Sequence, residues 1–363
     1  MTAVSPAPAE ATAHTSRWPM TPELAALPKV EMHIHLDGTL EPAMKLALAR
    51  RNGVTIAQSS EEEIRDSFVF HDLPTFLAVH YSNMDVLWTS LDYEELCYAY
   101  LSTAASQGVR HAEMFFDPQL HTSRGVPFDD IVRGYRRAIV RARSDFGVTA
   151  ELIMCFLRDY GADHAMTTLM SALRYRDWII GVGLDSDELR HPPAEYAAVF
   201  GRARREGFQI TMHCDVDQVD STEHIRQAIE DLGTQRIDHG LNVMESDALV
   251  ELARTRRIGF TVCPLPYSTH PTRGLPELEV IRGMLDAGLL VSVGSDDPPY
   301  FGGYLGDNLQ FMAEVGGFTL QELWLTQVHA VDIAWVSARR RQELLEELAG
   351  YARDHALDPS AAE

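Results

Sequence analysis

The sequence predicts an α/β fold, a (β/α)8 TIM barrel with a helical insertion after its first strand. Two observations carry this prediction: eight short apolar or β-branched runs recur along the chain, and segments with helical spacing separate them. Most of the runs are too short and too apolar for strands with one face in water, so we expect strands buried on both faces. The runs cover residues 29–36, 109–117, 148–157, 178–185, 209–215, 236–240, 258–264 and 289–295.

The alternation of these strands with helices favours a parallel barrel. The stretch 42–51 begins with proline and stops at Asn52-Gly53, a usual signal for the end of a helix. Residues 61–106 form the insertion, which we expect to be mostly helical. A doubly wound open sheet is the alternative, but no glycine-rich phosphate loop follows any predicted strand. Further helices are expected over 129–146, 194–206, 222–232, 247–256 and 277–287.

The chain length of 363 residues fits one large barrel with insertions. Residues 1–17 are rich in Ala, Pro, Ser and Thr, so we expect a disordered arm, and they lack the basic and apolar regions of a secretory signal. We expect residues 18–352 to form a single domain and residues 353–363 to form a flexible C-terminal tail.

The net charge is −22, from 31 basic and 53 acidic residues. A surface this acidic repels phosphate backbones and anionic lipid, so we expect neither nucleic acid nor membrane as a partner. The partner we expect is a small-molecule substrate held in a pocket. The cysteines Cys97, Cys155, Cys214 and Cys263 form no CxxC pair, which favours reduced thiols and a cytoplasmic protein.

The side chains that could bind a metal or act in catalysis fall at the C-terminal ends of the predicted strands. Barrels of this kind have their active sites at these ends. His33 and His35 lie two residues apart on the first strand, so they point the same way. Two adjacent imidazoles suit zinc. The fifth, sixth and eighth strands end near His213, His239 and Asp296. Four strand ends that each offer histidine or aspartate predict a metal site.

Such a site predicts hydrolysis. Three histidines and a carboxylate can hold one zinc ion and leave a position for water, whose pKa then falls from about 15.7 to about 7. Asp296, beside that water, can take its proton, and His239 can hold the hydroxide and stabilise charge. The HExxH and HxE…PCxxC zinc patterns are absent from the sequence.

At these residues the chain resembles the adenosine/adenine deaminase family of the metal-dependent amidohydrolases, from about residue 27 to about residue 310. The segment PKVEMHIHLDGTLEP at 28–42 is close to the family's first-strand motif. The segments HAEMFFDPQ at 111–119, CFLR at 155–158, GLDS at 183–186 and SDDPPYFGGYL at 295–305 resemble the adenine-deaminase branch.

The resemblance implies a role for each matched residue. The zinc ligands would be His33, His35, His213 and Asp296, with one zinc per chain. His239 would polarise the attacking water. Asp297 would contact the purine nitrogen on the five-membered side, and Ser186 would lie against a pyrimidine-side ring nitrogen. Asp37 stands where the nucleoside branch faces the ribose. Family members often self-associate, so a homo-oligomer is also compatible with the resemblance.

The fifth strand departs from the family motif. The family has His-Ala-Gly-Glu, whose Glu protonates the ring nitrogen beside the attacked carbon, whereas this chain has Val216 at that position. Valine cannot donate a proton, and such help is worth roughly 10²–10⁴ in rate. Asp215 or Asp217 could replace the Glu, the substrate could need no ring protonation, or the protein could bind a ligand without turning it over.

Two further departures point to a changed substrate. The family's Cys-Pro-Leu-Ser-Asn is Cys-Pro-Leu followed by Pro266-Tyr267 here, a stiffer and bulkier pair. Asp37 replaces the Glu that the adenine branch usually carries, which leaves room for a larger group. We therefore expect a zinc-dependent hydrolytic deaminase of a purine-like or other amino-bearing N-heterocycle with altered specificity. The alternatives are an amidohydrolase acting on a different C–N bond and a catalytically impaired ligand-binding homologue.

Overall fold

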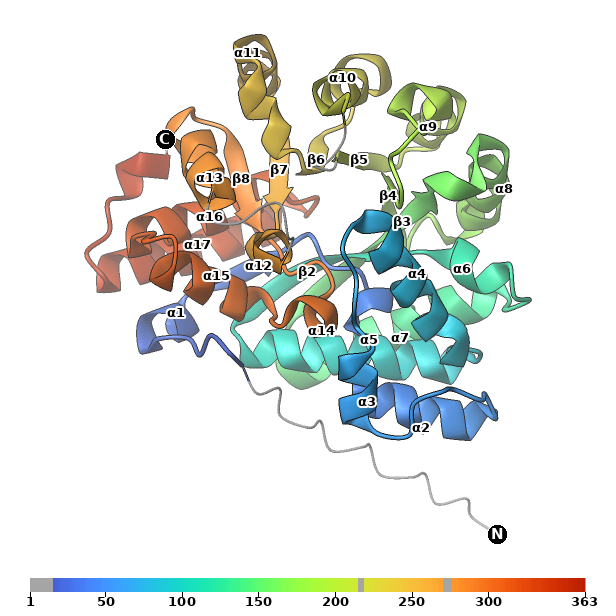
Figure 1. Cartoon of the computed structure of the whole chain (residues 1–363). Coiled ribbons are helices and arrows are strands. Elements are labelled where there is room, and N and C mark those ends of the chain that lie inside the picture. The colour runs from blue at the N-terminus through green and yellow to red at the C-terminus, as the bar shows by residue number, and fades with distance from the viewer. Residues whose placement is uncertain (1–15, 215–218, 270–275, 363) are drawn as a thin grey trace.

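The computed structural model describes residues 16–214, 219–269 and 276–362, without the side chains of residues 268, 269, 276, 361 and 362. Eight strands form one parallel sheet in the order β1 to β8, and helices surround it (Figure 1). The predicted (β/α)8 barrel is confirmed. The strands are β1 (Lys29–Glu31), β2 (Val109–Phe116), β3 (Thr149–Leu157), β4 (Ile179–Asp185), β5 (Gln209–Cys214), β6 (Arg236–His239), β7 (Gly259–Val262) and β8 (Leu290–Val293).

Each strand lies inside one of the eight predicted runs, and nearly every strand residue is buried. The first strand is shorter than its run because the chain after Glu31 serves both of its neighbours. The amide of His35 donates to the Asp296 carbonyl at 3.0 Å, and the amide of Leu36 donates to the Phe115 carbonyl at 2.8 Å. A parallel bridge between Ile34 and Asp296 joins the segment after β1 to the segment after β8 at this end of the barrel.

The predicted helices are present with small shifts at their ends. Helix α2 (Pro42–Asn52) stops at Gly53, which takes a left-handed conformation with φ 67°. The stretch expected as one helix over 222–232 begins as α10 (Ser221–Arg226) and continues as a π-helical turn, η6 (Gln227–Leu232). The other expected helices are α7 (Phe128–Phe146), α9 (Ala197–Arg205), α11 (Asp247–Thr255) and α13 (Pro276–Asp286).

The insertion contains α3 (Glu61–Asp66), α4 (Leu73–Asn83) and α5 (Ser90–Ser106). Helix α4 packs against the short α14 (Pro298–Phe301), because Phe76 meets Tyr300 at 5.4 Å and Phe301 at 5.2 Å between ring centroids. Figure 1 shows α4 and α14 on the side of the strands that faces the viewer. The insertion thus reaches the segment that directly follows Asp296 and Asp297.

The remaining helices complete the outer layer and the chain ends. They are α1 (Pro22–Ala26), α6 (Pro118–Thr122), α8 (Ala162–Ala172), α12 (Pro264–Thr269), α15 (Leu305–Glu314), α16 (Leu320–Ile333) and α17 (Ala338–Asp354). Most of the predicted N-terminal arm lies outside the described residues, and the predicted C-terminal tail overlaps the last residues of α17. Within the described part of the chain, no helix is long and apolar enough to cross a membrane.

Candidate metal centre and active site

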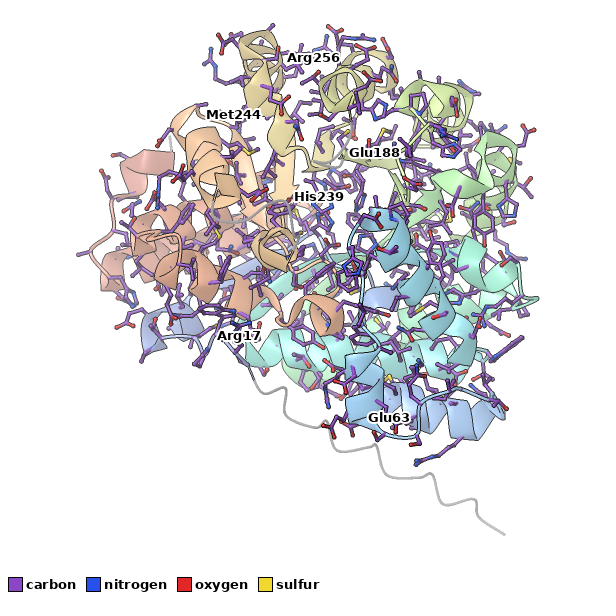
Figure 2. The ribbon with its side chains drawn as sticks, in the orientation of Figure 1. Arg17, Glu63, Glu188, His239, Met244 and Arg256 are labelled. Atoms are coloured by element: carbon purple, nitrogen blue, oxygen red, sulfur yellow. The ribbon has the colours of Figure 1, made fainter. Side chains whose placement is uncertain are left out.

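Five polar side chains meet at the C-terminal end of the barrel. His33 and His35 follow β1, His213 lies on β5, His239 ends β6, and Asp296 follows β8. Parallel strands bring these distant residues together because all their C-terminal ends open on one face. All five residues are more than nine-tenths buried. In Figure 2 the labelled His239 lies near the centre of the molecule, whereas Arg17, Glu63 and Arg256 lie toward its edge.

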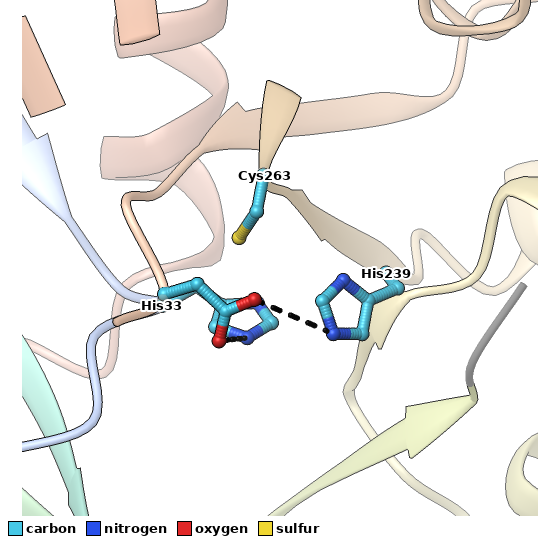
Figure 3. Close-up of side chains that lie close together, drawn as sticks. His33, His239 and Cys263 are labelled. Atoms are coloured by element: carbon cyan, nitrogen blue, oxygen red, sulfur yellow. Dashed lines mark ion pairs between the residues drawn. The ribbon is translucent and has the colours of Figure 1, made fainter. Parts of the chain in front are cut away.

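The atoms that face one another are those that bind metals. Nε2 of His35 lies 3.1 Å from Nε2 of His213. One carboxylate oxygen of Asp296 lies 3.5 Å from Nε2 of both His33 and His35. The other lies 4.0 Å from Nε2 of His239. Figure 3 shows the ion pairs that join His33 and His239 to this carboxylate.

This donor set fits a zinc ion. The ligand atoms of His33, His35 and His213 all lie within 4.8 Å of one another. Nε2 of His33 is buried and has no hydrogen-bond partner in the described part of the chain. A buried polar atom without a partner costs about 1–3 kcal/mol, which a metal bond would offset. Three imidazole nitrogens and one carboxylate oxygen are ligands that zinc prefers.

The other ring nitrogen of each of these three histidines faces an acceptor. Nδ1 of His33 lies 3.0 Å from the carbonyl oxygen and 2.9 Å from the hydroxyl of Thr261. Nδ1 of His213 lies 3.5 Å from Asp238, and Nδ1 of His35 lies 3.7 Å from Asp185. The last two contacts are longer than ordinary hydrogen bonds. Such outer partners hold the ring so that Nε2 is left for the metal.

The site also sets the protonation of its members. Burial lowers the pKa of His35 to about 3 and that of His239 to about 3. Burial and the neighbouring imidazoles hold the pKa of His213 well below its usual range. For Asp296, burial alone would raise the pKa, but the rings of His33 and His239 more than offset this and lower it. For His33, burial alone would lower the pKa, but the Asp296 carboxylate more than offsets this and raises it. The neutral imidazoles of His35, His213 and His239 and the ionised Asp296 are in the forms that ligate a metal.

Two of the five residues have strained backbones. His239 has φ 64° and Asp296 has φ 61°, and non-glycine residues rarely occupy this left-handed region. Strain of this kind costs about 1–3 kcal/mol and clusters at active sites. His239 is the last residue of β6 and Asp296 follows β8, so both residues lie where the chain leaves a strand.

A second group of acids lies beside the candidate metal ligands. Asp117 follows β2, Asp185 ends β4, and Asp297 follows Asp296. Burial and the neighbouring carboxylates hold the pKa values of Asp117 and Asp297 well above their usual range, and burial raises the pKa of Asp185 to about 7. One oxygen of Asp117 and one of Asp185 are buried without a hydrogen-bond partner among the described residues. These two acids are available to a ligand.

The predicted substrate residues differ in their surroundings. The Asp37 carboxylate accepts the amide of Asp117 at 3.0 Å, lies 2.9 Å from Nε2 of His121 and accepts the Tyr135 hydroxyl at 3.1 Å. Its oxygens therefore already have protein partners. The Ser186 hydroxyl donates to Asp159 at 2.7 Å and lies 2.7 Å from the Tyr81 hydroxyl. Their contacts with substrate stay predictions.

Asp297 is held close to a glycine turn. A Cβ added to Gly38 would lie 1.7 Å from a carboxylate oxygen of Asp297, so only glycine leaves room for that side chain. Asp215, Val216 and Asp217 lie outside the described residues. The choice between Asp215 and Asp217 as a proton donor therefore stays a prediction.

Sequence reasoning did not place two further residues in the site. Cys263 follows β7 and belongs to a group of possible metal ligands with His33, His239 and Asp296, but burial holds its thiol pKa well above the usual range, so the thiol stays protonated. The Tyr267 hydroxyl lies 3.0 Å from Nδ1 of His239 and accepts the Cys263 amide at 3.2 Å. Tyr267, one of the two residues that differ from the family motif, therefore contacts His239 and helps to hold its ring.

The same strand-end signal could have found Asp117 and Asp185, because each is the last residue of a predicted strand, and His213 and His239 lie near the ends of theirs. Arg158, in the motif at 155–158, is fully buried and donates to the carbonyl oxygen of His213. It also lies 3.5 Å from Glu188, which Figure 2 labels. Arg158 therefore supports the backbone of a ligand strand rather than the substrate.

The chain matches the family model described as adenosine deaminase over residues 28–351. It is 42% identical over 328 residues to the adenine deaminase of Rhodospirillum rubrum, covering 90% of this chain and 97% of that protein. A crystal structure of adenine deaminase from Arthrobacter aurescens is 36% identical, with a TM-score of 0.84, and covers 90% of this chain and 99% of that one. An amidohydrolase from Burkholderia ambifaria, solved with bound Zn, is 27% identical, with a TM-score of 0.84, and covers 95% and 98%.

The match extends over nearly all of the barrel, including every strand and every residue of the candidate metal centre. The relatives are matched over nearly their whole lengths. The chain therefore belongs to the adenosine deaminase family, and it is a hydrolytic deaminase that acts on C–N bonds.

Proposed function

We propose that the protein binds one zinc ion and deaminates a purine-like amino heterocycle, with a specificity that differs from that of an ordinary adenine deaminase. The observation that carries the zinc proposal is the set of three buried imidazoles and one carboxylate, in which Nε2 of His33 has no other partner among the described residues. The zinc-bound relative supports the choice of metal. When bound, zinc would supply a water that ionises near neutral pH.

The protein's own groups would complete the reaction. The ionised Asp296 carboxylate would accept the proton of the attacking water, and His239 would hold the attacking oxygen. Asp297, whose raised pKa keeps a proton on it, would donate a hydrogen bond to a ring nitrogen. Ser186 would contact the opposite side of the ring. The amino group leaves as ammonia.

The proton for the ring nitrogen is the step that separates this chain from the family motif. Val216 cannot supply it, so we propose that Asp215 or Asp217 does, or that the true substrate needs no such proton. The second alternative would extend to a C–N bond outside a purine ring, and the valine is the observation that favours it. The partner we propose is a small molecule alone, and the buried free cysteines are compatible with a cytoplasmic setting.

Metal analysis and a substrate panel test this proposal. We expect close to one zinc per chain and an adenine turnover below the usual enzyme range of about 1–10³ s⁻¹. Val216→Glu should raise adenine deamination by roughly 10²-fold or more, because it restores a proton donor. Val216→Gln is the matched control, since it has a similar size but donates no such proton. Full activity of the unchanged enzyme on adenine would contradict the altered specificity.

A further inference from the structure

Helix α4 is fixed over the site from two sides. The Tyr81 hydroxyl lies 2.7 Å from the hydroxyl of Ser186, just after β4. The side-chain amide of Asn83 donates from Nδ2 to the Tyr300 hydroxyl of α14 at 2.8 Å, and Lys45 Nζ donates to Asn83 Oδ1 at 2.5 Å. These bonds position the end of α4 between the segment after β4 and the segment after β8. The residue of α4 that directly precedes these two anchors is therefore held in a defined place.

His80 is that residue. It is 4% exposed, and its ring lies 5.8 Å from that of Phe76, 5.9 Å from that of Tyr81 and 5.7 Å from that of Tyr300, measured between centroids. These aromatic contacts fix the plane of the imidazole. The charged groups that act on it are Asp37, His121 and Asp296, which lie after β1, after β2 and after β8. His80 therefore faces the same end of the barrel as the metal ligands.

One ring nitrogen of His80 has no partner within the described part of the protein. Nδ1 is buried and has no hydrogen-bond partner among the residues that the structure describes. An imidazole nitrogen left in this state costs about 1–3 kcal/mol. Asp37, the acid that acts most strongly on His80, already has its oxygens engaged by Asp117 and by His121 with Tyr135. The hydrogen-bonding capacity of Nδ1 is therefore unused within the described part of the protein.

We propose that His80 binds the substrate, through Nδ1, at the edge of the heterocycle that lies away from the attacked carbon. This rests on the proposed function, because it takes the attacked carbon to lie at the metal. Burial lowers the pKa of His80 to about 4, so the ring is neutral and has one donor and one acceptor nitrogen. The ligand class that suits it is an aromatic heterocycle whose remote ring nitrogens are unsubstituted. In a purine these are the nitrogens at positions 3 and 9, so His80 would also favour a free base over a nucleoside.

His80 variants can separate this role from a structural one. Asparagine places an amide at the position of Nδ1, glutamine places one near Nε2, and phenylalanine fills the space without a polar atom. We expect His80→Phe to weaken binding of purine by about tenfold in calorimetry, since one hydrogen bond of this kind is worth about 1.4 kcal/mol. His80→Asn should stay within about threefold of the unchanged enzyme, and His80→Gln should resemble His80→Phe. His71→Phe is the matched control, because His71 is exposed and only its backbone amide bonds to Thr75.

Ligand analogues locate the contact. The ratio between purine and 9-methylpurine affinities should be large for the unchanged enzyme and should shrink toward one in His80→Phe. The ratio between purine and 7-deazapurine should be the same in both proteins. A thermal unfolding midpoint within a few degrees of the unchanged enzyme would show that each variant is folded.

The outcomes are separable from those of the proposed function. Equal purine affinity in all three His80 variants would overturn the inference, even if the enzyme deaminates amino heterocycles normally. A different result would separate the two proposals. If the enzyme deaminates none of the substrates tested, the proposed reaction is overturned. If purine binding is nevertheless weak in His80→Phe and near normal in His80→Asn, the binding role of His80 stands. Loss of purine binding in all three variants alike, with normal folding, would assign His80 to packing and also overturn the inference.

Discussion

Asp238 supports residues of the proposed metal centre through its hydrogen bonds. Its carboxylate accepts the Thr211 hydroxyl at 2.6 Å and the Thr261 hydroxyl at 2.8 Å, and it lies 3.5 Å from Nδ1 of His213. Thr261 in turn bonds to Nδ1 of His33. One buried carboxylate thus connects β5, β6 and β7 and orients two of the proposed ligands.

Replacing Asp238 should therefore weaken metal binding. Asp238→Asn keeps the size but weakens two acceptor bonds, and loss of an outer partner of this kind costs about 10–100-fold in metal affinity or activity. Competition for zinc against a chelator of known affinity measures the change. Asp247→Asn, on the exposed start of α11, should leave the affinity unchanged. An unchanged zinc affinity in Asp238→Asn would contradict this role.

At the residue scale, the sequence indicated which side chains could form the site. It did not indicate which hydrogen-bond partners each of them has. The strand-end pattern brought out His33, His35, His213, His239 and Asp296 because parallel strands share one open face. It could not show that Asp37 is engaged by His121 and Tyr135, because those bonds depend on how α6 and α7 pack. It also could not show that Nδ1 of His80 is left without a partner.

At the scale of the elements, the turn η1 (Asp37–Thr39) and the segment before α14 are fitted to each other. Gly38 lies against Asp297 so closely that even one added carbon would collide with the carboxylate. The Asp297 side chain therefore lies directly against the backbone of Gly38, which limits how far the carboxylate can move toward η1.

Gly38→Ala should displace Asp297 and reduce kcat/KM by about 10²-fold, since misplacing a binding group by about 1 Å has effects of this size. Steady-state kinetics with the best substrate of the panel would measure it. Gly283→Ala is the control, because its added carbon meets nothing closer than 3.6 Å and it lies in helix α13. Activity of Gly38→Ala near that of the control would contradict the proposed place of Asp297.

The strands were more predictable than the elements around them. A strand buried on both faces appears in the sequence as a short apolar run. The ends of these runs lie within a few residues of the ends of most strands. The first run was the exception, because the chain after Glu31 makes hydrogen bonds to both neighbouring segments rather than continuing as a regular strand. The place of the insertion could not be predicted, because α4 is located by contacts with distant residues such as Ser186 and Tyr300.

At the scale of the whole molecule, the barrel interior is closed at its other end by a buried ion pair. Glu113 of β2 accepts a hydrogen bond from Arg236 of β6, and both residues are fully buried. The Arg236 guanidinium lies 3.5 Å from the ring centroid of Trp335. Burial alone would raise the pKa of Glu113, but the Arg236 charge more than offsets this and lowers it to about 2.

This pair predicts a pH-dependent contribution to stability. A carboxyl whose pKa is lower in the folded state stabilises the protein above its unfolded pKa of about 4.5, and that contribution is lost as pH falls toward about 2. Glu113→Gln should cost about 3–5 kcal/mol at neutral pH, because it leaves Arg236 buried without its partner. Denaturant unfolding at pH 7 and pH 3 should show a smaller difference from the unchanged protein at the lower pH. The Michaelis constant should not change, since the pair lies away from the metal centre.

The closure of the barrel has a consequence for how the enzyme is made. The segment after β1 carries His33 and His35, and it is joined to the segment after β8 by the amide bonds around Asp296. During synthesis the three histidine ligands leave the ribosome well before the carboxylate that would complete their set. A nascent or truncated chain lacking β8 would therefore hold neither a closed barrel nor a complete metal centre. The last strand to be translated would then determine when the proposed metal centre can become complete.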